Sequence, residues 1–214
     1  MTNPQEPNNI KDDLTEAFRL LKKTVKATGV NLIDNYSYRE YTATEVLREH
    51  LPSIEKTIGR SGVDAKAEQE NYLKIEQKSG TNQSKTLTMS CFPKMMFDKQ
   101  SDAARRNYIY EYDGFSLSFF EYYVPYPTAV VFVPREHVTK LHPLFQTKQQ
   151  EKIKIFEQKT SQNKNIGHDA ITVSIEEMIE HIGAENMICW LHGVKIDSRD
   201  FFQQVSNKTI KINQ

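Results

Sequence analysis

Two carboxylates and an ammonium group lie close together in the sequence, around one expected strand. Asp64 precedes this strand, and Glu76 and Lys78 lie on it. Alternate side chains of a strand share a face, so we expect Glu76 and Lys78 to point to the same side. The same alternation places Tyr72 and Lys74 on that side. Carboxylates that converge at the end of a strand can hold a divalent cation beside a water molecule, which is the minimum needed to hydrolyse a phosphodiester.

Each of these residues has an expected role in that reaction. A phosphodiester is anionic and resists attack by water, and a metal ion lowers this barrier by neutralising charge and activating the water. Mg²⁺ prefers oxygen ligands, so we expect it to bind Asp64, Glu76 and the main-chain carbonyl of Gln77. Lys78 would contact the phosphate, orient or deprotonate the water and stabilise the charge of the transition state. The alternative interpretation is a solvated, charged strand, because Glu-x-Lys alone is common.

The segments Gly62-Val63-Asp64-Ala65 and Ile75-Glu76-Gln77-Lys78-Ser79 resemble the PD-(D/E)xK nuclease superfamily, and within it the type II restriction endonucleases of the PvuII kind. In those enzymes a Gly-x-Asp-Ala segment precedes a strand that carries Tyr-Glu-x-Lys-Ser. The resemblance covers roughly residues 40–135, including the stretch from Phe97 to Phe115 with its Arg105-Arg106 pair. The chain departs from the family at Val63, where a proline is usual, and at residues 85–90, which lack the histidine cluster of the recognition region.

The resemblance implies a fold, an activity and partners. The fold would be α/β (α+β), with a restriction-endonuclease-like mixed central sheet flanked by helices. The activity would be Mg²⁺-dependent cleavage of both strands of a short specific sequence in double-stranded DNA, as part of a restriction-modification system. A palindromic target implies a homodimer, because a symmetric dimer matches the two-fold axis of the site.

Several further residues are candidates for the same function. Glu45 is a possible auxiliary acid, although its place in Thr42-Ala-Thr-Glu45 also fits a helix capping box. Polar and basic side chains in three expected loops or helices are candidates for contact with bases or phosphates. These DNA-binding candidates are Asn82, Gln83, Ser84, Lys85, Arg105, Arg106, Lys164 and His168. Each has an ordinary alternative as a surface residue.

The periodicity predicts elements that would position these residues in one domain. We expect a disordered segment over residues 1–10 and a single domain over 11–214. Within it, helices over 11–28 and from Thr42 to 58 would form a dimerisation region, although the apolar stripe from Leu14 to Val25 also fits packing into the core of its own chain. Residues 59–135 would form the catalytic core, and 136–214 the C-terminal elements. Strands are expected over 72–78, 85–91, 113–121, 128–134 and 170–173, a loop over 80–84, and helices over 98–108, 135–142 and 147–158. A capping box at Ser174–Glu177, a hairpin over His192-Gly193 and a helix capped by Asp197 would follow.

The composition excludes some classes of protein. The 214 residues carry 28 basic and 28 acidic side chains, so a strongly basic nucleic-acid binder is excluded, although a local basic face is not. The two cysteines show no disulfide or zinc spacing. No apolar run suggests a membrane span or signal peptide, so we expect a bacterial cytoplasmic protein without membrane partners. Two alternatives remain: a DNA repair or resolving nuclease of the same fold, and a non-enzymatic DNA- or protein-binding protein of phage or plasmid origin.

Overall fold

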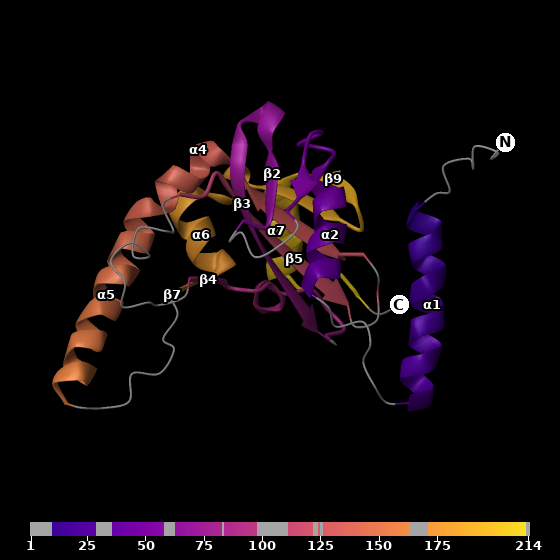
Figure 1. Ribbon diagram of the computed structural model, residues 1–214, viewed down its shortest axis with the longest axis horizontal. Helices are drawn as coiled ribbons and strands as arrows, with labels where there is room; N and C mark the ends of the chain where they lie inside the picture. The colour runs from indigo at the N-terminus through magenta and orange to yellow at the C-terminus, as the bar shows by residue number, and fades with distance from the viewer. Residues whose placement is uncertain are drawn as a thin grey trace.

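The computed structural model of the protein describes residues 10–28, 36–57, 63–82, 84–97, 111–121, 124, 126–162 and 171–212. Its centre is a seven-stranded sheet (Figure 1). In order across the sheet, the strands are β1 (Glu55–Lys56), β2 (Ala65–Ala67), β3 (Tyr72–Asn82), β5 (Gly114–Glu121), β6 (Ala129–Val133), β8 (Ile188–Leu191) and β9 (Val194–Ile196). β3 and β5 are parallel, and the other neighbours are antiparallel. β4 (Met95–Phe97) and β7 (Ile171–Val173) form a separate two-stranded sheet.

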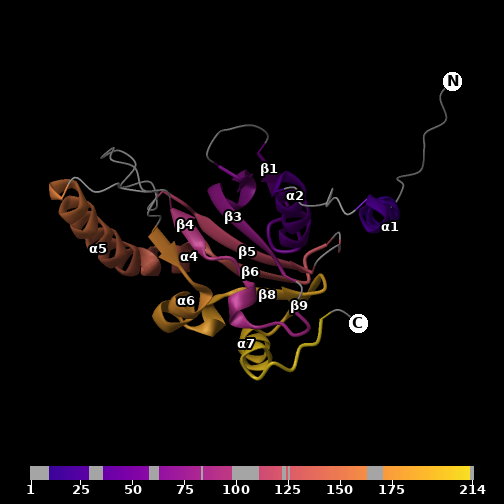
Figure 2. The same cartoon turned by 90° about the horizontal axis from the view of Figure 1, so that it is seen from below.

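Helices cover both faces of the large sheet. The α-helices are α1 (Ile10–Thr28), α2 (Tyr36–Leu47), α4 (Arg135–Val138), α5 (His142–Ser161), α6 (Ile175–Ile182) and α7 (Ser198–Ser206). Short 3₁₀ turns are η1 (Glu68–Glu70), η2 (Met89–Cys91), η4 (Thr139–Leu141) and η5 (Ala184–Asn186). Figure 2 shows α2 on one face and α6 and α7 on the other. The predicted mixed sheet flanked by helices is therefore confirmed.

Each face of the sheet has its own apolar cluster. Ile75 of β3 packs with Leu47 and Leu51 on the α2 side. On the other side, Leu117 of β5 belongs to a larger cluster with residues of α6 and α7, including Phe201. Because side chains alternate along a strand, one strand contributes to both clusters. Ile75, which precedes the candidate acid Glu76, packs β3 against the α2 layer.

Helix α1 lies to one side of this body (Figure 1). Phe18 on α1 is buried, and its ring centroid lies 4.7 Å from that of Tyr38 on α2. Leu20 on the same helix is exposed. The proposed use of residues 11–58 in dimerisation stays a prediction. No helix in the described part of the chain has the length and apolar character to cross a membrane.

The second helix differs from the prediction at both ends. It begins at Tyr36 and ends at Leu47, so the expected helix from Thr42 to 58 is wrong. Thr42 is inside the helix, where its hydroxyl donates to main-chain carbonyls of Tyr38 and Arg39 instead of capping an N-terminus. Pro52 lies beyond the helix, in agreement with the inability of proline to continue one.

Two further predictions around β3 are wrong. β3 runs on to Asn82, through most of the expected loop over 80–84. The expected strand over 85–91 is absent; this segment has an isolated bridge between Thr86 and Lys211 and then the η2 turn. The pairing stops after two main-chain hydrogen bonds, from the N–H of Leu87 to the carbonyl of Ile210 and from the N–H of Ile212 to the carbonyl of Lys85, so the alternating pattern does not lead to a strand. The predicted helix over 98–108 lies outside the described residues.

The expected helices over 135–142 and 147–158 differ in their bounds from α4 and α5, since α5 begins at His142, but the predicted caps and hairpin after Val173 are confirmed. Ser174 and Glu177 form a reciprocal capping box at the start of α6. His192 and Gly193 both have positive φ values, 50° and 77°, as a two-residue hairpin turn between β8 and β9 requires. Asp197 accepts a hydrogen bond from the main chain of Asp200 and caps α7.

Candidate functional site

Asp64 lies where three strands meet at one edge of the sheet. Its main-chain carbonyl accepts a hydrogen bond from the N–H of Thr57, at 2.9 Å, just after β1. Its own N–H donates to the carbonyl of Ile75 on β3, at 3.3 Å. These two bonds fix the main chain of Asp64 immediately before β2 begins at Ala65. Asp64 and Glu76 are distant in the sequence, and antiparallel pairing brings Asp64 next to the strand that carries Glu76.

The carboxylate of Asp64 contacts the main chain of β3. Its Oδ2 accepts a hydrogen bond from the N–H of Gln77 at 2.7 Å. The N–H and C=O of one strand residue point toward the same side of the strand. The carbonyl of Gln77 therefore faces the edge at which the carboxylate of Asp64 lies, as a shared metal site would require.

Glu76 and Lys78 share one face of β3, as predicted. The Nζ of Lys78 lies 2.5 Å from Oε1 of Glu76. Glu76 is only 5% exposed, whereas Lys78 is partly exposed. Gln77 points to the opposite face, where its amide contacts α2. Asp64, Glu76 and Lys78 are thus brought to one end of the sheet edge.

Tyr72 does not share that face, and this part of the prediction is wrong. It packs in the same apolar cluster as Ile75, three residues further on. The register explains this, because Ala65 pairs with Ile75 but Ala67 pairs with Tyr72. β3 thus holds one extra residue over this interval, and such a bulge reverses the face of the residues before it.

The electrostatics of Asp64 reflect a crowded acidic site. Burial raises the pKa of Asp64 to about 6, from 3.8, and the negative charge of Glu76 adds to this rise. The hydrogen bond from Gln77 opposes it, Glu40 adds to it, and Lys78 opposes it. Two carboxylates that repel each other in a partly buried site favour a bound cation, which would relieve the repulsion.

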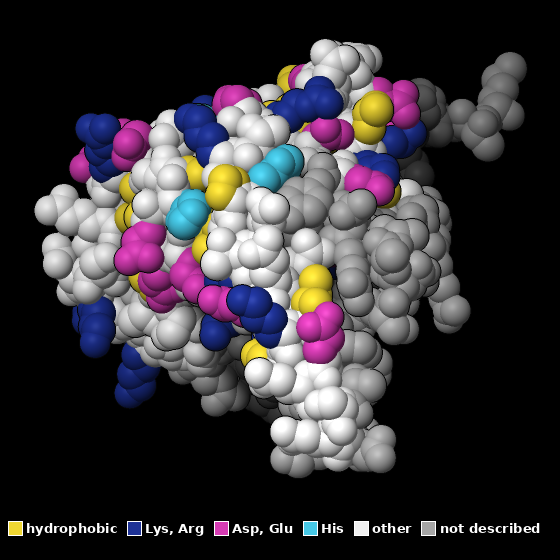
Figure 3. Space-filling view, turned by 90° about the vertical axis from the view of Figure 1, so that its left-hand side faces the viewer, with side chains coloured by type: hydrophobic (Ala, Val, Ile, Leu, Met, Phe, Trp, Pro, Cys, Tyr) yellow, Lys and Arg dark blue, Asp and Glu magenta, His cyan; other side chains and the backbone are white. Residues whose placement is uncertain are grey.

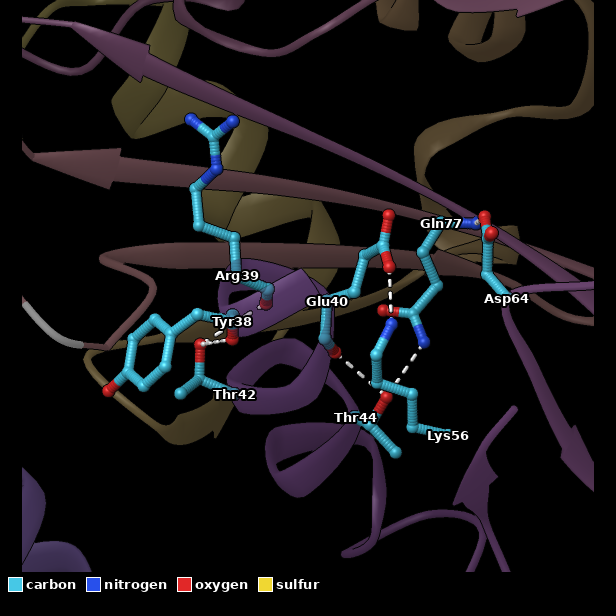
Figure 4. A network of polar contacts seen from close by, with 8 residues as sticks. All are labelled: Tyr38, Arg39, Glu40, Thr42, Thr44, Lys56, Asp64 and Gln77. Carbon is cyan, nitrogen blue, oxygen red and sulfur yellow. Dashed lines mark hydrogen bonds and ion pairs between the residues drawn. The ribbon is translucent and has the colours of Figure 1, made fainter. Parts of the chain in front are cut away.

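Glu40 and Lys56 form the part of the site that sequence reasoning missed. Glu40 on α2 and Lys56 on β1 make an ion pair in which both side chains are 19% exposed. Figure 4 shows this pair beside the side chain of Gln77, with Asp64 next to the main chain of the same residue. A helix beginning at Tyr36 would have placed Glu40 and Thr44 on one face, four residues apart. The tyrosine-rich sequence and its weak apolar periodicity suggested a loop instead.

Glu45, the predicted auxiliary acid, lies on the same helix in a different environment. It pairs with Arg48 at 3.0 Å, and both side chains are well exposed. The capping role that we considered for it is wrong, because α2 begins at Tyr36. The helix acid that influences Asp64 is Glu40.

The residues at the sheet edge fit Mg²⁺ in kind. Mg²⁺ is usually bound through one or two carboxylates and keeps several waters, so Asp64, Glu76 and the Gln77 carbonyl are a sufficient protein set. Within the ranges that the structure describes, no three His, Cys, Asp or Glu side chains are grouped closely enough to hold a metal ion by themselves. Glu40, the third nearby acid, is paired with Lys56.

The predicted DNA contacts are only partly within the described residues. Asn82 ends β3, and its side-chain oxygen accepts from the N–H of Ser84 at 3.1 Å, as in a turn. Lys85 is exposed just after it. Outside the described residues lie Gln83, Arg105, Arg106, Lys164 and His168. On the face drawn in Figure 3, basic and acidic side chains are interspersed, with no continuous basic stripe.

Comparison with known proteins adds no family to this geometry. The chain matches no protein-family model, and no curated protein is similar to it at a significant level.

Proposed function

We propose that the chain is a type II restriction endonuclease that hydrolyses double-stranded DNA at a short specific sequence with Mg²⁺. The observation that carries this proposal is the hydrogen bond from the Gln77 N–H to Asp64, at 2.7 Å, next to the Glu76–Lys78 ion pair. This contact joins two segments that the sequence resemblance treats as one site. The mixed sheet with flanking helices is the class of fold that the resemblance implies.

The roles follow from the positions of the side chains. Asp64 and Glu76 would hold the cation together with the Gln77 carbonyl. When bound, Mg²⁺ would supply charge neutralisation and an activated water. Lys78 is partly exposed, so its ammonium group can reach a phosphate from its place beside Glu76. There it would orient the water and stabilise the charge that develops during hydrolysis.

Digestion of long DNA tests the proposal. Purified protein is incubated with phage DNA and Mg²⁺, and the ends of the fragments are sequenced. We expect discrete fragments with a common sequence at their ends, and no cleavage by a Glu76→Gln variant. Glu68→Gln is the matched control, because Glu68 is a fully exposed acid that pairs with Lys66 on the surface.

Other outcomes assign a different function. Cleavage confined to mismatched or branched DNA would replace restriction with a repair or resolving nuclease. Absence of cleavage with every divalent cation would leave a non-enzymatic binding protein and would overturn the nuclease assignment. Sedimentation velocity of the intact chain tests the accompanying proposal of a homodimer.

A further inference from the structure

Gln77 has a side chain whose chemistry neither packing nor metal binding explains. It is 3% exposed and lies on the α2 face of β3, where its neighbour Ile75 is fully buried in an apolar cluster. An amide in such a position costs free energy unless it is hydrogen-bonded, whereas an aliphatic side chain would not. The resemblance to nucleases concerns only the main chain of this residue.

The amide of Gln77 joins β3 to α2. Its Nε2 donates to the hydroxyl of Thr44 at 2.8 Å, and both side chains are buried. The same hydroxyl donates to the main-chain carbonyl of Glu40, also at 2.8 Å. Figure 4 shows this continuous path from β3 to the turn of α2 that carries Glu40. Hydrogen bonds between buried polar groups restrict the relative position of the elements that they join.

We propose that Gln77 is a positioning residue whose amide, through Thr44, fixes the main chain of β3 against α2 and so places Asp64 for metal binding. The inference rests on the proposed function for the role of the metal. Its structural basis is that one residue uses its side chain to contact α2 and its main-chain N–H to hold Asp64. A shift of β3 relative to α2 would therefore move the N–H of Gln77 and, with it, the carbonyl on the same side.

A matched pair of threonines on α2 allows a controlled test. Thr42 and Thr44 are both buried, and each hydroxyl donates to carbonyls of its own helix. Only Thr44 also accepts from Gln77. The variants are Thr44→Val, Thr42→Val and Gln77→Met. The first and third remove the hydrogen bond between Gln77 and Thr44. Using two link variants protects the test if Gln77→Met fails to fold.

Three measurements separate positioning from general stability. These are the unfolding midpoint in urea, the dissociation constant for Mg²⁺ measured by calorimetry, and the Mg²⁺ concentration for half-maximal cleavage. We expect Thr44→Val and Gln77→Met to raise the required Mg²⁺ concentration about 10–100-fold, as for other residues that orient metal ligands. We also expect the dissociation constant for Mg²⁺ to rise by a similar factor, because the Gln77 N–H that holds Asp64 would be displaced. Thr42→Val should change the urea midpoint alone.

The two proposals fail in different ways. Equal behaviour of Thr44→Val and Thr42→Val in both the calorimetric affinity for Mg²⁺ and the Mg²⁺ dependence of cleavage would overturn the positioning role. A parent protein that cleaves no DNA would overturn the proposed function. In that case the binding of Mg²⁺ measured by calorimetry still decides whether Gln77 positions Asp64.

Discussion

The carboxylate of Asp64 accepts a hydrogen bond from the main-chain N–H of Gln77, thirteen residues away, at 2.7 Å. This contact places an acid at the start of one strand against the centre of the next. It also explains why Asp64 is both held in place and electrostatically unfavourable. The N–H favours the charged carboxylate, while burial and Glu76 disfavour it, and the balance raises the pKa of Asp64 to about 6.

We first expect Asp64 to reduce the stability of the metal-free protein at neutral pH. The pKa of Asp64 is higher in the folded state, at about 6, than its ordinary value of 3.8. Its contribution to stability is therefore full below pH 3.8, falls as the pH rises from about 4 to 6, and is constant above that range. Asp64→Asn removes this loss of stability at higher pH and keeps an oxygen that can accept the hydrogen bond from the Gln77 N–H. The variant should melt higher than the parent at pH 8, by about 2–4 °C for each kcal/mol gained.

Thermal melts of both proteins at pH 4 and pH 8, without divalent cations, measure this effect. The same variant should lose cleavage and lose the stabilisation that Mg²⁺ gives the parent. A variant that melts lower than the parent at pH 8 would contradict the conclusion that the charged form of Asp64 destabilises the metal-free protein.

The second prediction concerns the lysine on the same face. Lys78→Arg keeps the positive charge beside Glu76, so binding of DNA and of Mg²⁺ should persist. Guanidinium remains protonated in proteins, so it cannot accept a proton from water as an amine can. If Lys78 takes part in proton transfer, cleavage should fall about 10²–10⁴-fold in single-turnover assays. Lys74→Arg is the control, because Lys74 is also ion-paired on β3, with Glu111, but its pair is exposed.

The third prediction distinguishes the two acids of α2. Glu40→Gln should lower the pKa of Asp64, because the negative charge of Glu40 helps to raise it. Glu45→Gln should leave the titration of Asp64 unchanged, since Glu45 pairs with Arg48 on an exposed surface. NMR titration of the Asp64 carboxyl in both variants provides the measurement. Equal shifts in the two variants would contradict the conclusion that Glu40, and not Glu45, raises the pKa of Asp64.

The fourth prediction concerns buried polar atoms beneath α2. Gln77 and Ser116 are partners in the parallel pairing of β3 with β5, and Ser79 follows on the same face of β3. Within the described chain, Oε1 of Gln77 and the hydroxyls of Ser79 and Ser116 have no hydrogen-bond partner. Buried polar atoms without a protein partner commonly bind an ordered water.

A crystal structure should show that water, in contact with at least two of these atoms. Ser116→Ala removes one of its partners and should reduce the free energy of unfolding by about 1–3 kcal/mol in urea titrations. Continuous density for direct side-chain contacts, with no water between them, would contradict the prediction.

The sequence by itself determined the local features of this protein. Glu76 and Lys78 share a face because alternation in a strand is a property of the backbone. The capping box of α6 and the turn at His192-Gly193 are specified by residues close together in the chain. The apolar strand β6 was predictable for the same reason, since burial on both faces favours apolar residues along its length.

Only the tertiary structure decided which distant residues meet. α2 buries the polar residues Thr42 and Thr44, so its first turns do not show apolar periodicity, and Glu40 was missed in consequence. The extra residue in β3 turned Tyr72 to the other face, because register depends on the partner strand and not on β3 alone. Asp64 reaches Gln77 through antiparallel pairing of β2 with β3, and Thr44 reaches the same residue through the packing of α2. Contacts between separate elements depend on how those elements pack, and local sequence patterns do not specify that packing.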